Sequence, residues 1–184
     1  ILAFHKRCQD FYPADAVDAS IQQQRGWYDA LCAEFDAPSP EGLKRRDEIV
    51  GGRVSVRRYQ PAEIAAQTRI FYIHGGGFVV GSLESHDAIC AEIAHAAKAE
   101  LVSIDYRLAP EHVWPAAFDD CFEVLLWLLA DGRPLVVAGD SAGGNLAAGM
   151  VLKAKAEAID GIVGQVLIYP GLGGDLVSGS YAEM

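Results

Sequence analysis

The strongest constraint on the fold is an alternation that begins at Arg69, where short apolar runs rich in β-branched residues are separated by longer segments with helical periodicity. The apolar runs cover residues 70–73, 101–104, 135–138 and 162–169, and the helical segments cover residues 86–98, 116–130 and 142–157. Apolar runs of this kind are typical of parallel strands that are buried on both faces by crossover helices. The pattern therefore predicts an α/β fold with a mostly parallel sheet, in which ligands bind beyond the carboxyl ends of the strands.

The residues before this alternation have a different character. Apolar side chains recur at a spacing near 3.6 from Val17 to Phe35, which predicts one amphipathic helix. Residues 49–59 alternate between apolar and polar side chains and are interrupted by two glycines, which indicates a β-hairpin. We therefore expect an N-terminal segment, residues 1–40, to lie against a core that spans residues 41–170.

Charge and hydropathy exclude two classes of partner. The chain has 15 Lys and Arg residues against 25 Asp and Glu residues, and its net charge of −10 repels nucleic acids and anionic membranes. The longest apolar stretch, residues 124–130, is far shorter than the ~20 residues that a membrane-spanning helix needs. We expect neither a nucleic acid nor a membrane as partner.

The four cysteines, Cys8, Cys32, Cys90 and Cys121, are widely spaced and include no C-x-x-C pair. Their spacing fits neither a zinc site nor a disulfide framework, so they are predicted to be free thiols that mostly fill apolar space. Free thiols indicate a reducing compartment, and a cytoplasmic location is expected.

The third β/α unit carries a G-x-S-x-G motif in residues 139–143, between a predicted strand and a predicted helix. In this position Ser141 would sit on a sharp turn that only small neighbours tolerate, with its hydroxyl lifted above the sheet. The N–H of Ala142 would then point toward the place where an oxyanion forms. In a chain with 19 glycines the motif alone is a weak indication, and its meaning depends on the strand and helix around it.

The first β/α unit is followed by the rarer string His74-Gly75-Gly76-Gly77-Phe78. Consecutive glycines let a loop bring bare N–H groups close to a substrate carbonyl, and a hydrolase of this topology takes the rest of its oxyanion hole from this place. A flexible turn and a phosphate-binding loop are the alternatives. Residues 75–82 fit the phosphate-binding patterns poorly, which favours the oxyanion hole.

These two strings, together with Asp105-Tyr-Arg-Leu-Ala-Pro-Glu111 between them, resemble the bacterial hormone-sensitive-lipase-like esterases of the α/β-hydrolase superfamily. The resemblance runs from about residue 53 to about residue 174. It implies an α/β-hydrolase fold with a helical cap, part of which is built from residues 1–40. Val113 and Trp114 depart slightly from the family, which usually has Pro and Phe at these positions.

The resemblance also implies the roles of individual residues. Ser141 would be the nucleophile, and the oxyanion hole would consist of the N–H groups of Gly76, Gly77 and Ala142. Gly75 would shape this loop, and His74 would anchor it through a hydrogen bond.

Three charged residues of the second motif, Asp105, Arg107 and Glu111, are expected to form an ion-pair network under the active-site loop. Asp140, which precedes the serine, is assigned a supporting role. His86 follows Ser85, a good N-cap residue, so a helix start is expected there rather than a catalytic group.

The residues of this chain do not complete a catalytic triad. The fold supplies its triad in the chain order Ser, then Asp or Glu, then His, yet all five histidines precede Ser141. The run at residues 162–169 is apolar enough for an interior strand, but no further strand is predicted after it. We therefore expect these residues to be the front portion of a longer chain, interrupted in residues 171–184, where the family begins its cap insertion. The rest of the fold, with the triad Asp and His, would lie outside this chain, either in the remainder of that longer chain or on a second polypeptide segment.

The function predicted from these residues is a serine carboxylesterase that hydrolyses short- to medium-chain acyl esters and needs no metal and no organic cofactor. The alternatives are a non-catalytic small-molecule binder of the same superfamily, which keeps the pocket without the triad histidine, and an inactive fragment.

Overall fold

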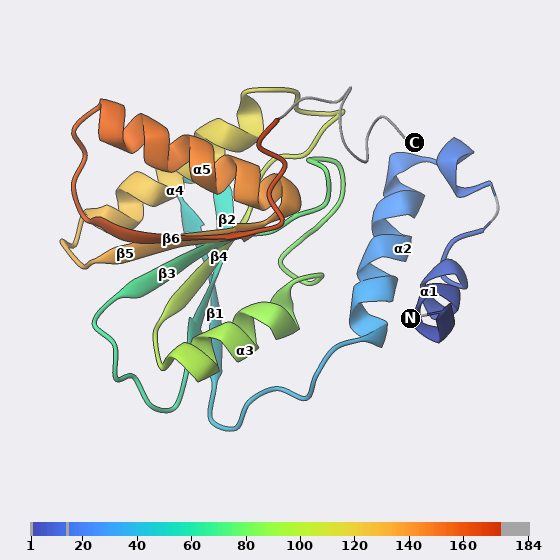
Figure 1. Ribbon diagram of the computed structural model, residues 1–184, viewed down its shortest axis with the longest axis horizontal. Coiled ribbons are helices and arrows are strands. Elements are labelled where there is room, and N and C mark those ends of the chain that lie inside the picture. Colours follow the sequence, from blue (N-terminus) through green and yellow to red (C-terminus); the bar gives the residue numbers. More distant parts are fainter. Residues whose placement is uncertain (1, 14, 174–184) are drawn as a thin grey trace.

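A computed structural model describes residues 2–13 and 15–173, which include a six-stranded mixed sheet (Figure 1). The strands are β1 (Lys44–Val50), β2 (Val54–Gln60), β3 (Arg69–Ile73), β4 (Leu101–Asp105), β5 (Leu135–Asp140) and β6 (Ile162–Ile168), and their order across the sheet is β1-β2-β4-β3-β5-β6. The β1–β2 hairpin is antiparallel and β2 joins β4 antiparallel, whereas β4, β3, β5 and β6 run parallel. The predicted hairpin, the four predicted strands and the α/β class are confirmed.

Helices cover both faces of this sheet. α3 (Asp87–Ala97) lies on one face, and α4 (Ala116–Leu129) and α5 (Ser141–Ala156) lie together on the other (Figure 1). All three begin and end within about a residue of the segments expected from periodicity. This agreement follows from their burial, because each helix places an apolar face against the sheet.

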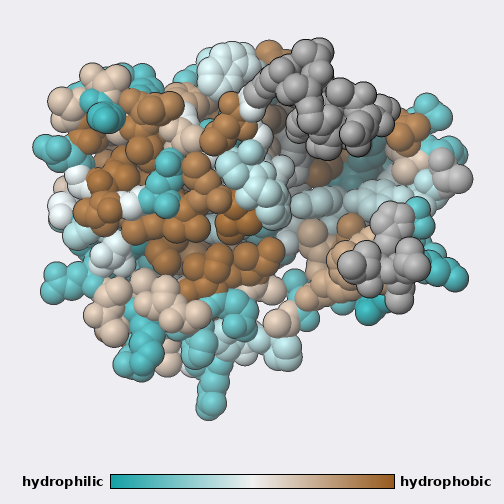
Figure 2. All heavy atoms as spheres, viewed as in Figure 1, coloured by the Kyte–Doolittle hydropathy of each residue, from teal (hydrophilic) through white to brown (hydrophobic). Residues whose placement is uncertain are grey.

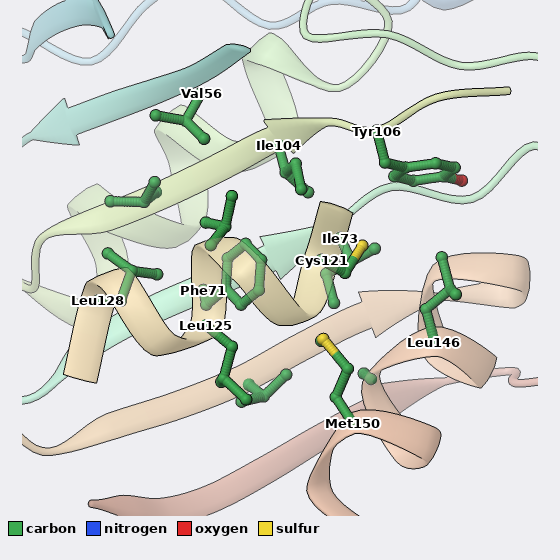
Figure 3. Packing of buried hydrophobic residues seen from close by; sticks show 14 of the residues in the cluster. Val56, Phe71, Ile73, Ile104, Tyr106, Cys121, Leu125, Leu128, Leu146 and Met150 are labelled. Atoms are coloured by element: carbon green, nitrogen blue, oxygen red, sulfur yellow. The ribbon is translucent and has the colours of Figure 1, made fainter. Parts of the chain in front are cut away.

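Strand β3 shows how alternation divides the core between the two faces. Phe71 and Ile73 point toward α4 and α5 and pack with Leu125 and Met150 (Figure 3). Tyr72, between them, points to the opposite face and packs with Cys90 of α3. Since successive side chains of a strand face opposite sides, a strand buried on both faces reads as a continuous apolar run.

The N-terminal helices stand beside the sheet rather than on either of its faces (Figure 1). The expectation of one helix starting at Val17 is wrong in two respects. A helix α1 (Leu2–Gln9) precedes it, and residues Ala16–Asp18 form a 3-10 turn before α2 (Ile21–Glu34). α2 begins after Ser20 because the Ser20 hydroxyl accepts the N–H of Gln23 while the Gln23 side chain accepts the N–H of Ser20, a capping box.

Strand β6 is the last strand of the sheet in the described part of the chain, where it pairs only with β5. Its side chains are partly open to solvent, and Val163 and Val166 are 62% and 50% exposed. Figure 2 shows apolar residues gathered on the face of the molecule that α5 and β6 form in Figure 1. Most of the expected cap insertion, residues 174–184, lies outside the described residues. No helix within residues 2–13 and 15–173 is both long and apolar enough to cross a membrane.

Candidate active site

Ser141 sits where strand β5 meets helix α5, in a backbone conformation that is rare for a residue with a side chain. β5 ends at Asp140, α5 begins at Ser141, and the φ angle of Ser141 is 49°. A Cβ atom on Gly139 would lie 2.6 Å from the carbonyl carbon of Gly143, and one on Gly143 would lie 2.0 Å from the Ile73 oxygen. Both glycines are therefore required sterically, because the turn brings them against the backbone of α5 and of β3.

The glycine loop, defined here as residues 74–81, leaves the sheet next to this turn. β3 and β5 are parallel neighbours, and Ile73 pairs with Gly139, so the loop and the serine emerge side by side. Gly76 and Gly77 have φ angles of 118° and 61°, and the Gly76 carbonyl accepts the N–H groups of Val79 and Val80 at 3.1 and 3.0 Å. The result is a tight turn with two glycines in left-handed conformations, which leave their N–H groups free of side-chain cover.

Asp140 joins the turn to the loop. Its Oδ1 accepts the Tyr72 hydroxyl at 2.9 Å and the Gly75 N–H at 3.0 Å, and it lies 3.4 Å from Nε2 of His86. Burial alone would raise the pKa of Asp140, but the hydrogen bond and charge of His86, with the Tyr72 and Gly75 hydrogen bonds, outweigh burial and lower it. The carboxylate preceding the serine is thus ionised and hydrogen-bonded to the glycine loop.

His74 lies behind the loop, where it is buried. Its Nδ1 donates to the Gly75 carbonyl at 2.7 Å, its ring stacks on Tyr106 at 4.3 Å, and the Tyr106 hydroxyl donates to the His74 carbonyl at 2.9 Å. Burial lowers the pKa of His74 to about 4. The imidazole is therefore neutral near pH 7, and the hydrogen bond to Gly75 is the kind of contact expected of a residue that anchors the loop.

The ion-pair network expected among Asp105, Arg107 and Glu111 does not form. Arg107 instead donates to the buried Asp120 at 2.9 Å, and Asp120 also pairs with Arg53. Asp105 ends β4, and burial raises the pKa of its carboxyl. The prediction failed because the second motif turns away from the sheet after β4, so charges two and four residues apart face different neighbours.

Glu111 pairs with Arg25 of α2, a residue that the sequence analysis did not single out. Arg25 donates to both carboxylate oxygens of Glu111, at 3.0 and 2.7 Å, and also to the carbonyls of Val79 and Ala109. In the sequence of α2, Arg25 is one polar residue among several. No local pattern connects it with Val79 or Glu111, which lie 54 and 86 residues further along the chain.

The expectation for His86 was incomplete. α3 begins at Asp87, but His86 does not cap it through its side chain, and the Ser85 hydroxyl accepts the Ser82 N–H instead. His86 is buried next to Asp140, so it contacts the turn that carries Ser141 in addition to preceding a helix. Its position before α3 was the available signal, because α3 begins beside the edge of the sheet where β5 ends and Asp140 lies.

Two mostly apolar cavities lie near these groups. One, of about 370 Å³, is bordered by Gly77, Phe78, Trp114 and Leu146. The other, of about 580 Å³, lies between the N-terminal helices and α3 and is bordered by residues that include Tyr28, Leu31 and Ile89. No group of three or more His, Cys, Asp or Glu side chains within the described ranges is arranged to hold a metal ion.

A serine turn between strand and helix, beside a glycine loop from the neighbouring strand, is the arrangement of the α/β-hydrolase class. The family model described as the alpha/beta hydrolase fold matches residues 70–183, and the chain belongs to this family.

The named relatives to which the chain is similar are esterases and ester hydrolases. It is 42% identical over 129 residues to "Esterase LipI" of Mycobacterium tuberculosis, covering 65% of this chain and 40% of that protein. It is 38% identical over 169 residues to "Ethyl acetate hydrolase" of Pseudomonas putida, covering 85% of this chain and 52% of that protein.

A solved structure of an esterase from the bacterial hormone-sensitive lipase family superimposes with a TM-score of 0.81 at 25% identity, covering 91% of this chain and 56% of that one. The chain thus spans about half the length of the relatives it matches.

Proposed function

We propose that this chain carries the nucleophile and the oxyanion hole of a serine carboxylesterase that hydrolyses short- to medium-chain acyl esters. The observation that carries the proposal is the φ angle of 49° at Ser141, on a turn hydrogen-bonded through Asp140 to the glycine loop. Backbone strain of this size is kept at a non-glycine residue where the fold needs that side chain in that place. Residues 1–40, which contain α1 and α2, would serve as part of the cap over this site.

In the proposed reaction, Ser141 Oγ attacks the ester carbonyl carbon while a base removes the hydroxyl proton. The carbonyl oxygen becomes an oxyanion and accepts hydrogen bonds from the N–H groups of Gly76, Gly77 and Ala142. The alcohol leaves with a proton returned by the base, and water then hydrolyses the acyl-serine by the same steps. This sequence requires neither a metal nor an organic cofactor.

The base is proposed to come from a histidine outside these 184 residues, with the triad acid. His86 is engaged with Asp140, and His74 has a pKa of about 4, which makes it too weak a base near neutral pH. The share of the relatives' length that this chain covers, 40% and 52%, leaves room for both groups elsewhere.

The size and lining of the two cavities support a small apolar ester as substrate. Neither cavity presents a cluster of cations, which a phosphorylated or acidic substrate would need, and Arg107 at the smaller one is already paired with Asp120. The name of the Pseudomonas relative, an ethyl acetate hydrolase, is consistent with a short acyl group. A reducing compartment such as the cytoplasm is proposed from four free cysteines, of which Cys90 and Cys121 are buried.

Chemical rescue tests this proposal in the chain itself. A serine without its base loses several orders of magnitude in rate, so p-nitrophenyl acetate should be hydrolysed near background. Added imidazole should then accelerate hydrolysis by the wild type well above hydrolysis by Ser141→Ala, and peptide mass spectrometry should find the acetyl group on Ser141. Equal rates for the two proteins, with tight binding of a small apolar ligand, would support the non-catalytic binder instead.

A further inference from the structure

Arg25 connects helix α2 to two loops of the core through four hydrogen bonds. Its Nε donates to the Val79 carbonyl at 2.8 Å, and its Nη2 donates to the Ala109 carbonyl at 3.0 Å. Its Nη1 and Nη2 donate to the two carboxylate oxygens of Glu111 at 3.0 and 2.7 Å. The guanidinium is partly buried between these groups, so its planar fork determines their relative positions.

One of these acceptors belongs to the turn that presents the oxyanion N–H groups. The N–H of Val79 donates to the Gly76 carbonyl at 3.1 Å, and the carbonyl of the same residue accepts from Arg25. The carbonyl of Phe78 accepts the Ala109 N–H at 2.8 Å, and the Ala109 carbonyl again accepts from Arg25. Two consecutive carbonyls of the glycine loop therefore depend on Arg25. The Val79 carbonyl accepts from it directly, and the Phe78 carbonyl accepts from Ala109, whose own carbonyl accepts from Arg25.

A second contact links α2 to the residue that directly follows this loop. Asp29, one turn after Arg25 on α2, accepts the Ser82 hydroxyl at 3.0 Å. Since side chains four residues apart lie on the same face of a helix, Arg25 and Asp29 direct one face of α2 toward the loop.

We propose that Arg25 is a positioning residue that couples the placement of α2 to the geometry of the oxyanion hole. This inference rests on the proposed esterase function of the site. Gly76 and Gly77 have no side chains that could pack and fix their orientation, so contacts to the backbone must do so. When α2 is docked, Arg25 holds the Val79 peptide and the turn keeps its N–H groups in place; when α2 moves away, that support is lost.

The test is amide hydrogen exchange of the glycine loop in Arg25→Ala and Arg25→Lys. Both variants lose the fork, and Arg25→Lys keeps the charge. We expect exchange at Val79 and Val80 to rise about tenfold to a hundredfold in both, the range for losing a hydrogen bond to a charged group. Arg7→Ala is the matched control, because Arg7 pairs with Glu34 and lies over the Phe35 ring, both within the N-terminal segment. The inference is overturned if Arg25→Lys exchanges like Arg7→Ala, a comparison that stands even where Arg25→Ala does not fold.

Acylation of Ser141 by p-nitrophenyl acetate in the presence of imidazole supplies the second readout. Arg25→Lys should lower the maximal acylation rate about tenfold while the ester concentration at half-maximal rate changes less than twofold. A loss of ester binding with an unchanged maximal rate would overturn the positioning role. If p-nitrophenyl acetate does not acylate Ser141 of the wild-type chain, the proposed function fails. The exchange experiment still decides whether Arg25 orders the loop.

Discussion

Replacing Asp140 by Asn tests how strongly the serine turn is tied to the glycine loop. The side chain of Asp140 is only 8% exposed, and its Oδ1 faces the Tyr72 hydroxyl, the Gly75 N–H and His86. Asparagine has the same shape and can place its carbonyl oxygen at the position of Oδ1. The substitution therefore removes the negative charge without creating a cavity, and it replaces Oδ2, which accepts the Tyr169 hydroxyl at 3.4 Å, with an NH2 group.

The expected loss follows from the number of donors. A hydrogen bond to a charged group contributes roughly 1.5–3 kcal/mol, and one between neutral groups roughly 0.5–1.5 kcal/mol. Weakening three of them by about 1 kcal/mol each lowers the free energy of unfolding by about 2–4 kcal/mol. Asp47→Asn is the control, because Asp47 is 59% exposed where it pairs with Arg57, and exposed ion pairs contribute about 1 kcal/mol or less.

Urea unfolding measured from pH 7 down to pH 3 separates the charge effect from other causes. Because the pKa of Asp140 is lower in the folded chain, its ionised form stabilises the fold above the unfolded pKa of about 4, and this contribution is lost as the pH falls through the folded pKa. The difference between wild type and Asp140→Asn should thus be full at pH 7 and shrink below about pH 4. A variant as stable as wild type at pH 7, or a difference that persists unchanged at pH 3, would refute this account.

Three further outcomes are expected. Gly143→Ala should destabilise severely or prevent folding, since its Cβ would lie 2.0 Å from the Ile73 oxygen, whereas Gly77→Ala, which faces open space at a φ of 61°, should cost about 1–2 kcal/mol in urea unfolding. Ser141→Gly should raise the free energy of unfolding by about 1 kcal/mol over wild type, because glycine adopts a φ of 49° without strain, while acylation is abolished. Since burial lowers the pKa of His74 to about 4, the unfolded chain takes up a proton there below about pH 6.5 before the folded chain does. Wild-type stability should therefore fall between pH 6.5 and pH 4 by up to about 3 kcal/mol, and a pH series of His74→Gln should show a shallower slope.

The sheet and its helices could be predicted because burial gives each of them a local pattern of apolar residues in the sequence. β3 and β4 are mostly apolar since both of their faces are covered, and α4 shows the 3.6-residue period of a helix with one buried face. Ser141 and the glycine loop could be predicted for a related reason. A turn that places the backbone of Gly143 against Ile73 admits only glycine, so the steric requirement appears directly in the sequence.

The contacts that support the site could not be predicted in the same way. Arg25 meets Val79 and Glu111 across 54 and 86 residues, and Asp140 meets Gly75 across 65. The partner of a charged side chain on a loop depends on how the surrounding segments turn, which local propensity does not determine. The network expected within 105–111 is an example, since nearness in sequence predicted partners for Arg107 and Glu111 that the turns of the loop keep apart.

These long-range contacts explain how a loop with three consecutive glycines can keep one geometry. Glycine allows the loop to approach a substrate, but it also has the largest backbone freedom to lose on ordering, so the loop needs support from elsewhere. That support reaches its backbone from three elements: Asp140 of the serine turn accepts the Gly75 N–H, Tyr106 after β4 donates to the His74 carbonyl, and Arg25 of α2 donates to the Val79 carbonyl. Two of these contacts come from the strands on either side of β3 and belong to the rigid sheet. The third comes from the N-terminal segment, which is why movement of α2 is the change expected to loosen the proposed oxyanion hole while the serine turn stays in place.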